Sequence, residues 1–442
     1  MFRKTLTVMK IAIAGTGISA NSAAYMLSRH HDVTVYEKEN RIGGHSNTVD
    51  VDYDGVTIPV DTGFIVYNEL NYPRMTKLFA ELGVQTQESD MSFAVSTMGG
   101  AFEWSGRTVR SVFAQRRNLF SPGFLFMLRE IFRFNRLARE DLETGLEEDV
   151  SLGDYLDGHK FSGRFMRDYL LPMGAAIWST PANEMLRFPA RSFLDFFRNH
   201  RLIDEDRPTW RTGTGGSRSY VEKLTAPFAN NIRTGIGIAH ITRTDEGVLV
   251  TGTDGQTERY DHIVIGAHSD EALAMLADPS DAETRLLGAV RYGPNTVYLH
   301  RDPSLMPRRK SAWSAWNYLS PGRIDKGGQL SVTYWMNQLQ GIDDKYPVFV
   351  TLNPSEPPRE DLTFQQMHYD HPMFDAAALA AQRQMASIQG TRNTWFCGAW
   401  LGYGFHEDGL SSGLDAAQMV LDSIDEDVSH KPALKPFVEA AE

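Results

Sequence analysis

The sequence predicts an α/β fold in which a domain built on a parallel sheet is interleaved with a second, α+β domain. Two observations lead to this prediction. Residues 11–14 and 33–36 are short apolar runs separated by a glycine turn and a helical stretch, which is the pattern of a β-α-β unit. Apolar runs that end in small residues recur at 260–267 and 394–399. The parallel sheet is therefore expected to be assembled from distant segments.

The turn between the first two runs has the spacing of a dinucleotide-binding motif. It reads Gly15-Thr16-Gly17-Ile18-Ser19-Ala20, and Glu37 follows 22 residues after Gly15. Gly15 permits the tight turn, and Gly17 lets the backbone approach a pyrophosphate at the helix N-terminus. Glu37 is placed to accept hydrogen bonds from an adenosine ribose. The segment thus predicts a Rossmann-like dinucleotide site.

The residues after Glu37 favour FAD over NAD. Gly43 and Gly44 extend the motif in a way that resembles the FAD fingerprint of glutathione-reductase-type flavoproteins. A glycine pair lets a loop cross close to the phosphates and the ribityl chain. Non-covalent FAD is the expected cofactor, because the only cysteine, Cys397, falls in a predicted buried strand, and His45 is expected to be an unmodified neighbour.

The chain is too long for one hydrophobic core, and its segments alternate between two kinds of structure. FAD-binding segments are expected at residues 1–84, 206–284 and 391–425. A helical part of the substrate domain is expected at 85–205, and an antiparallel sheet of the same domain at 285–390. Residues 426–442 are expected to form a tail.

Charge and composition exclude several classes of protein. The net charge of −12 argues against a nucleic-acid partner, because phosphate binding needs a basic face. A single cysteine excludes an internal disulfide and a cysteine-built metal site, and no metal is expected. No apolar run approaches the ~18–20 residues that span a bilayer, and residues 1–8 lack the apolar core of a secretory signal. A cytoplasmic protein is the expectation.

One basic segment stands out in this acidic chain. Residues 107–140 carry eight arginines interleaved with phenylalanines, and from Pro122 onward the pattern is helical. Two interpretations stay open. The segment is either a substrate-domain helix with a solvated arginine face or an amphipathic helix at an anionic surface such as the inner membrane.

Over nearly its full length the chain resembles the FAD-dependent amine oxidase and phytoene desaturase superfamily. The anchors besides the glycine motif are Cys397-Gly398-Ala399 and Asp408-Gly409-x-x-Ser412-Gly413. Segments 313–318, 333–337 and 404–409 are most similar to a bacterial branch of NAD/FAD-binding, amine-oxidoreductase-like proteins. That branch is implied to act in fatty-acyl lipid modification, for example on methyl-branched or cyclopropane chains.

The resemblance implies a set of cofactor contacts, most of them with backbone atoms. Two positions depart from the family pattern: His45 replaces the usual Arg, and Ala399 replaces the usual Asp or Glu. Thr62 and Gly63, in the turn 61–64, are expected near the cofactor, although an ordinary Asx-type turn stays open. The implied contacts are Gly15, Gly17, Ile18 and Ser19 for the pyrophosphate; Glu37 and Lys38 for the ribose; Ile238 for adenine; Gly43, Gly44 and His45 for the ribityl side; Gly398 for the phosphates; and His406, Glu407, Asp408, Gly409 and Leu410 at the flavin ring.

Only one dinucleotide motif is found, so the substrate itself is expected to exchange a hydride with flavin N5. His406 is the predicted proton-handling group, and Tyr334 and Trp316, with Trp335 and Tyr403, are expected to wall the flavin. A histidine that only hydrogen-bonds, and aromatics that only pack, remain open. The leading prediction is an FAD-dependent oxidoreductase that desaturates or oxidises a lipid acyl chain. The alternatives are an amine oxidase and a lipid-binding flavoprotein with a structural or isomerase flavin. The sequence indicates no oligomeric state.

Overall fold

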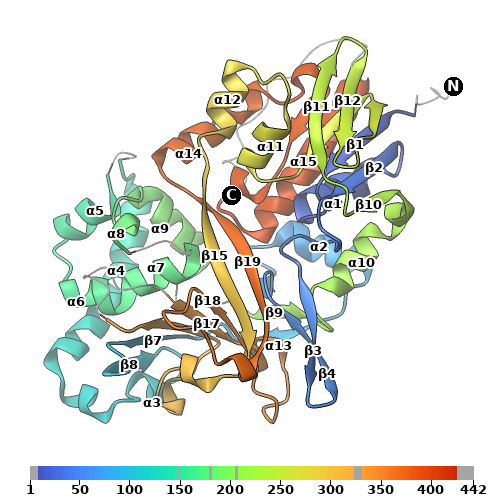
Figure 1. Cartoon of the computed structure of the whole chain (residues 1–442). Helices are drawn as coiled ribbons and strands as arrows, with labels where there is room; N and C mark the ends of the chain where they lie inside the picture. The colour runs from blue at the N-terminus through green and yellow to red at the C-terminus, as the bar shows by residue number, and fades with distance from the viewer. Residues whose placement is uncertain (1–7, 148–149, 179–181, 205–207, 323–330, 426–442) are drawn as a thin grey trace.

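The computed structural model describes residues 8–147, 150–178, 182–204, 208–322 and 331–425. The predicted tail at 426–442 lies outside the described residues. A parallel sheet with its helices forms one half of the molecule, and a helical layer and a second sheet form the other half (Figure 1). The predicted α/β class with an interleaved α+β domain is confirmed. The boundaries proposed for the individual segments stay a prediction.

The parallel sheet contains five strands that come from four distant parts of the chain. Its first strand is buried on both faces, as the apolar run predicted: Ile11 and Ile13 pack on one side of the sheet, whereas Ala12 and Ala14 pack on the opposite side. In spatial order the strands are β10 (Ile232–Thr234), β2 (Asp32–Glu37), β1 (Lys10–Ala14), β14 (His262–Ile265) and β20 (Thr394–Phe396).

Two helices from distant parts of the chain cover one face of this sheet. α1 (Ile18–Leu27) follows the glycine turn, and α15 (His406–Asp425) lies against it. Gly413 allows this close approach, since a Cβ atom there would lie 2.0 Å from the carbonyl oxygen of Ser19. The other face is covered by a three-stranded antiparallel sheet and two helices: β11 (Ile238–Thr244), β12 (Gly247–Gly252), β13 (Thr257–Tyr260), α11 (Ser269–Met275) and α12 (Asp281–Leu287).

A seven-stranded sheet forms the floor of the other half. All neighbouring strands are antiparallel except β7 and β16, which run parallel. The antiparallel sheet was predicted, but the parallel pair was not, because β7 and β8 come from the segment expected to be helical. In spatial order the strands are β19 (Thr363–Met373), β15 (Arg291–His300), β18 (Phe349–Leu352), β17 (Ser331–Trp335), β16 (Trp316–Ser320), β7 (Phe93–Thr97) and β8 (Phe102–Ser105).

Two long strands join the halves. β15 and β19 are paired along ten residues of β15 and run between the two halves (Figure 1). β19 continues to Met373, and α14 covers Ala376–Gln382. β16 begins at Trp316, after a 3-10 turn at Lys310–Ala312.

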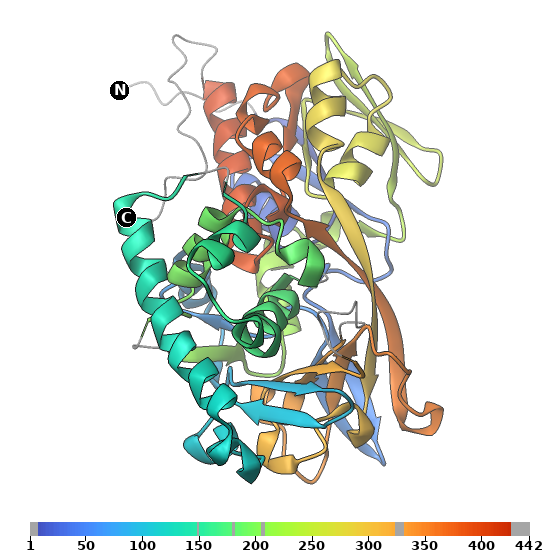
Figure 2. The ribbon, with the colours of Figure 1, turned by 90° about the vertical axis from the view of Figure 1, so that its left-hand side faces the viewer.

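The helical layer packs on this sheet around a phenylalanine-rich core that includes Phe124, Phe134, Phe193 and Phe197. The longest helix, α4, begins at Pro122, where the Ser121 side chain caps it, and lies along the edge of the molecule (Figure 2). The helices here are α3 (Val109–Val112), η1 (Arg116–Phe120), α4 (Pro122–Thr144), α5 (Leu152–Gly158), α6 (Gly163–Phe165), the π-helical turn η2 (Met166–Leu170), α7 (Leu171–Trp178), α8 (Ala182–Met185) and α9 (Ala190–Asn199).

The remaining elements connect the halves. They are the hairpin β3 (Thr48–Tyr53) and β4 (Val56–Asp61), the small sheet β5 (Tyr67–Asn68), β9 (Trp210–Gly213) and β6 (Thr86–Ser89), and helices α2 (Pro73–Leu82), α10 (Arg218–Thr225) and α13 (Met336–Gln340). Across the described ranges, no helix is both long enough and apolar enough to cross a membrane.

Candidate active site

A cavity of about 1050 Å³ lies between the two halves. The β1–α1 turn, the loop after Gly44, the turn 62–66, β19 and the residues before α15 all contribute to its wall. Its volume is at the upper end of the range for ligand pockets, about 300–1,000 Å³, which suits an extended cofactor together with a substrate. Fifteen of the predicted site residues line it: Gly15, Gly17, Ile18, Ser19, Glu37, Lys38, Gly44, His45, Thr62, Gly63, Ile238, Trp316, Tyr334, Gly398 and His406.

The glycine turn has the geometry that a pyrophosphate needs. Gly15 has a φ of +93°, and a Cβ atom there would lie 3.1 Å from the carbonyl oxygen of Gly266. At Gly17 no atom counted in the described chain lies within 4 Å of the Cβ position, so the cavity is open at this point. Helix α1 receives no side-chain cap from the described residues at Gly17, which leaves its first N–H groups available to an anion.

Glu37 closes the nucleotide end of the cavity. Its carboxylate accepts hydrogen bonds from the backbone N–H of Thr16 at 2.9 Å and from the backbone N–H of Glu39 at 2.9 Å, and also from the Thr16 hydroxyl. These bonds hold the carboxylate at the end of β2, on the cavity wall, where a ribose hydroxyl can donate to its remaining lone pairs. Lys38 pairs with Glu271 of α11 on the same wall.

The backbone at His45 and the backbone at Gly63 are in close contact on the cavity wall. A Cβ atom at Gly63 would lie 2.1 Å from the carbonyl oxygen of His45, and the N–H of Phe64 donates to that oxygen at 2.8 Å. Only glycine permits such a close approach. Gly44 similarly touches the glycine turn, because its Cβ position is 2.9 Å from the Cα of Gly17. Thr62, Gly63 and Phe64 of the turn 61–64 line the cavity.

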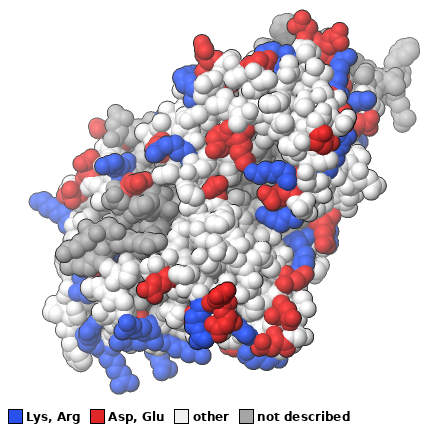
Figure 3. All heavy atoms as spheres, in the orientation of Figure 1, with Lys and Arg blue, Asp and Glu red and all other residues white. Residues whose placement is uncertain are grey.

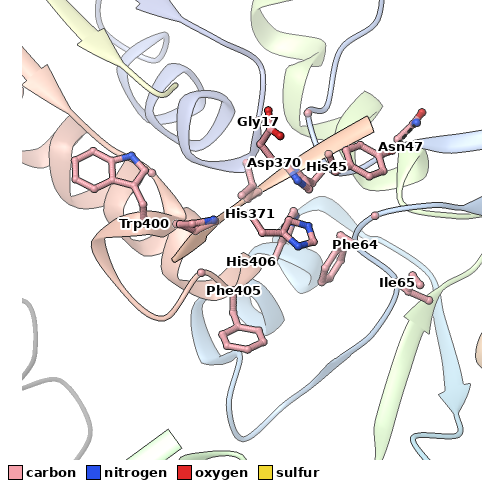
Figure 4. A pocket seen from close by; sticks show the side chains of 18 of the residues that line it. Gly17, His45, Asn47, Phe64, Ile65, Asp370, His371, Trp400, Phe405 and His406 are labelled. Atoms are coloured by element: carbon pink, nitrogen blue, oxygen red, sulfur yellow. Dashed lines mark hydrogen bonds between the residues drawn. The ribbon is translucent and has the colours of Figure 1, made fainter. Parts of the chain in front are cut away.

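His406, the predicted proton-handling residue, lies at the start of α15 and on the cavity wall. Its Nε2 atom is 2.6 Å from the Tyr220 hydroxyl and 3.2 Å from the Ser46 hydroxyl. Its ring stacks on Phe64, with centroids 3.8 Å apart (Figure 4). Burial lowers the pKa of His406 to about 3, so the imidazole is neutral at physiological pH.

Further histidines, which the sequence analysis did not single out, share this wall. The ring of His371 on β19 lies 5.6 Å from the ring of His45 (Figure 4). The ring of His268 lies 6.3 Å from the ring of His45. Burial lowers the pKa of all three, that of His371 to about 4. Mutually close imidazoles in a buried site stay neutral. No group of His, Cys, Asp or Glu in the described ranges is arranged to hold a metal ion.

Five predicted contact residues do not reach the cavity wall: Gly43, Glu407, Asp408, Gly409 and Leu410. The Glu407 carboxylate accepts from the N–H groups of Arg74 and Met75 and so caps α2, which the described residues otherwise leave without a side-chain cap. Asp408 accepts from the N–H groups of Tyr403 and Phe405. A Cβ atom at Gly409 would contact α1 at Ile18. The C-terminal motif thus serves helix packing and capping in this structure.

Trp316 and Tyr334 lie side by side on the sheet wall of the cavity, with ring centroids 5.0 Å apart and planes at 83°. The Nε1 atom of Trp316 is buried and has no hydrogen-bond partner among the described residues. Of the other two predicted aromatics, Trp335 lies away from the cavity wall, where it packs on Trp313, and Tyr403 is also absent from the wall.

The helical layer and strands β7 and β8 together supply an apolar end to the cavity. Phe93, Trp104, Ile131, Met173 and Ile177 line it, together with Tyr169, Phe196 and His200. The carboxylates on the described part of the cavity wall are Glu37, Glu39, Glu271 and Asp370, and none belongs to the helical layer. A cation buried at the apolar end would therefore find no carboxylate among the described residues there to balance its charge.

A glycine turn at a helix N-terminus without a described side-chain cap, the carboxylate of Glu37 on the cavity wall and a cavity between the two halves are the features of a dinucleotide-binding fold. The family description "Flavin containing amine oxidoreductase" matches residues 17–345, and the chain belongs to this family. It is an FAD-dependent oxidoreductase of the amine oxidase family. The residues at the glycine turn fit the flavin nucleotide that the family contains, as the open space at Gly17 shows.

Solved structures of the same fold cover almost the whole chain. A cyclohexylamine oxidase from Brevibacterium oxydans has a TM-score of 0.68 at 15% identity, covering 95% of this chain and 100% of that one. A CLA-producing fatty acid isomerase from P. acnes has a TM-score of 0.66 at 15% identity, covering 96% and 99%. A putrescine oxidase bound to putrescine has a TM-score of 0.65 at 14% identity, covering 94% and 99%. At these identities the likeness shows the fold alone. No curated protein sequence matches the chain.

Proposed function

We propose that this enzyme binds FAD non-covalently and oxidises a long acyl chain, introducing a double bond. The observation that carries the proposal is the buried Nε1–H of Trp316 on the cavity wall, which has no hydrogen-bond partner among the described residues. Indole nitrogen is a hydrogen-bond donor only, so its partner must be an acceptor such as the oxygen of an acyl carbonyl or carboxylate. An ammonium group offers no lone pair to this donor.

The walls around Trp316 support the same substrate class. The apolar end of the cavity, at Trp104, Ile131, Met173 and Ile177, removes hydrocarbon from water at about 25 cal/mol per Å² of buried surface. The described residues of that end carry no carboxylate to balance a cation. An acyl chain in the apolar end, with its oxygen near Trp316, satisfies both features.

Non-covalent cofactor binding is supported by the position of Cys397. The thiol is fully buried in the core between the parallel sheet and its helices, and it does not line the cavity. Burial raises the pKa of Cys397 to about 12, which disfavours the thiolate needed to form a bond to the cofactor.

When bound, the flavin would supply a two-electron acceptor for a hydride from a substrate carbon, and an acceptor of the oxygen or quinone class would be needed to reoxidise it. The protein's residues hold the acyl oxygen at Trp316 and exclude water from the apolar end. The proton from the neighbouring carbon would pass to a neutral imidazole of the wall, and His45 is the candidate, because the Nε2 atom of His406 already contacts the hydroxyls of Tyr220 and Ser46.

Oxidation of an amine is the second candidate. The perpendicular Trp316–Tyr334 pair presents ring faces that attract a cation, with about 0.5–2 kcal/mol for each such contact. An isomerase, in which the flavin undergoes no net redox change, is the third.

Product analysis separates the three. Purified protein is incubated with a long-chain acyl lipid or with the alkylamine of equal chain length, in the presence of oxygen or a soluble quinone. We expect an acyl product that has lost two hydrogen atoms, with reduction of the acceptor in equal amount. An isomeric product of unchanged mass would support the isomerase, and an aldehyde with released ammonia would support the amine oxidase. Either result would contradict the proposal.

A further inference from the structure

One face of the helical layer exposes large apolar side chains to solvent. Phe120 is 86% exposed, Val109 is 80% exposed and Phe132 is 75% exposed. They lie on α3, on η1 and on the outer side of α4, and we call this surface the helical face. Its exposed apolar residues are Val109, Leu119, Phe120, Leu125, Phe126 and Phe132. Several large apolar side chains exposed within one short stretch, residues 109–132, are a feature of an interaction surface.

The same face is strongly basic. Residues 106–129 contain five arginines and no acidic residue, in a chain whose net charge is −12. Arg110, Arg116, Arg117 and Arg129 have no carboxylate partner among the described residues. Figure 3 shows basic side chains gathered at the lower left of the molecule, where α3 and the start of α4 lie in Figure 1. Basic charge around exposed apolar side chains is complementary to an anionic lipid surface.

A small pocket beside Phe120 adds a binding site for an anion. It has a volume of about 450 Å³, and Arg117, Arg164 and Arg167 line it with a single carboxylate, Asp168. Both Arg164 and Arg167 pair with Asp168, which leaves an excess of positive charge.

Asn118 gives the second, independent sign of a ligand in this pocket. The residue is only 3% exposed, it lines the pocket, and its side-chain nitrogen has no partner among the described residues. A buried amide N–H without an acceptor is unfavourable, so an acceptor from outside the chain is favoured. A phosphate oxygen would satisfy both this donor and the arginines.

The helical face also adjoins the catalytic cavity. Ile131 of α4 lines the cavity, whereas the next residue, Phe132, is exposed on the outer side of the helix. Only one layer of helix thus separates the apolar end of the cavity from the helical face. This link to an acyl substrate rests on the proposed function, but the surface and its pocket do not.

We propose that the helical face docks on the surface of an anionic phospholipid bilayer. Phe120, Phe126 and Phe132 enter the acyl boundary, and the arginines face the headgroups. The pocket at Asn118 and Arg167 receives a headgroup phosphate. A nucleic acid would match the charge but offers no apolar phase for the phenylalanines, which is why the bilayer is preferred.

Flotation with vesicles tests the proposal on the flavin-loaded protein. Vesicles of phosphatidylcholine with phosphatidylglycerol should bind the protein at least about ten times more tightly than vesicles of phosphatidylcholine alone, and added salt should weaken the binding. The variants Phe120→Ser/Phe132→Ser and Arg110→Glu/Arg116→Glu should each lose at least about ten-fold in binding. Asn118→Leu should reduce the preference for the anionic lipid.

Two control variants carry matched changes elsewhere. Leu70→Ser removes an apolar side chain that is 62% exposed, and Lys77→Glu reverses an exposed charge on α2. Both should bind vesicles like the wild type, and flavin content and circular dichroism report folding of every variant. Equal binding to neutral vesicles, or equal loss in the controls, would overturn the proposal. A dimer that the Phe120→Ser/Phe132→Ser variant dissociates, without any change in vesicle binding, would assign the face to a second copy of the chain. Vesicle binding needs no turnover, so its failure is distinct from failure of the proposed function.

Discussion

The imidazole of His406 stacks on the ring of Phe64, with a centroid distance of 3.8 Å and an angle of 9° between the planes. The contact joins the first residue of α15 to the turn after β4, two segments far apart in the chain. The Tyr220 hydroxyl, 2.6 Å from His406 Nε2, contacts the edge of the same ring. The two contacts together hold the neutral imidazole of His406 in place on the cavity wall.

The first prediction concerns how the rate of turnover of a His406 variant depends on pH. Because burial lowers the pKa of His406 to about 3, His406→Asn should leave the ionisations seen between pH 5 and 9 unchanged. Turnover should fall by less than the ~10²–10⁴-fold typical of a lost acid–base group. Steady-state rates of wild type and variant over this pH range provide the measurement. Disappearance of an ionisation near neutral pH in the variant would restore His406 as the proton-handling residue.

Gly17 offers a clean test of the cofactor site. A side chain there meets no described atom within 4 Å of its Cβ, so Gly17→Val should leave the thermal stability of the flavin-free protein unchanged. The valine would occupy the space that a pyrophosphate needs, so flavin affinity should fall by at least about ten-fold. Gly163→Ala, another glycine with open space at its Cβ, is the control and should retain flavin. Full flavin retention by Gly17→Val would contradict this placement of the cofactor.

Trp316→Phe removes one donor and keeps an aromatic ring in place. If Nε1 donates to the acyl oxygen, KM for the acyl substrate should rise by about five- to ten-fold, as expected for a lost hydrogen bond of ~1–1.5 kcal/mol. The KM of an alkane-like analogue without the oxygen should stay the same. An unchanged KM for both compounds would remove Trp316 from substrate recognition.

The apolar end of the cavity should set the preferred chain length. Ile177 lies on its wall in α7, so Ile177→Trp should fill part of that end and shift the preference toward shorter acyl chains. The ratio of kcat/KM for long and short chains measures the shift, and the short chain is the internal control. An equal loss of kcat/KM for both chain lengths would indicate a general structural defect. It would contradict the role of this wall in selecting chain length.

Asp408 predicts a pH-dependent change in stability. Burial raises its pKa from 3.8 to about 7, so the folded protein binds this proton more tightly than the unfolded chain. The free energy of unfolding therefore falls as pH rises from about 4 to 7. Asp408→Asn keeps an acceptor for the N–H groups of Tyr403 and Phe405 without the charge. Between pH 5 and pH 8, the free energy of unfolding of the variant should rise by about 2 kcal/mol relative to that of the wild type. Denaturant unfolding at the two pH values measures this change. A constant difference across this range would refute the buried ionisation.

The part of the fold that depends on local pattern could be predicted from sequence. The apolar run 11–14, the glycine turn and Glu37 fixed the first strand, the helix and the second strand within a few residues. These features are local, since burial on both faces and a tight turn leave direct traces in composition. The capped start of α4 at Pro122 is another such feature.

Features that depend on distant contacts could not be predicted. The parallel pairing of β7 with β16 joins segments more than two hundred residues apart, and no local signal encodes it. The neutral histidines of the wall come from the loop after Gly44, the end of β14 and β19, and only the fold brings them together. The role of Glu407 as a cap for α2 is hidden for the same reason, because its partners Arg74 and Met75 lie in another domain segment.

The proposed function is tested most directly by the colour of the flavin under anaerobic conditions. The purified, oxidised enzyme is mixed without oxygen with a long-chain acyl lipid and, in parallel, with the alkylamine of the same chain length. We predict that the acyl lipid bleaches the flavin absorbance and the amine does not. Bleaching by the amine alone, or by neither compound across a panel of acyl lipids, would contradict the proposal.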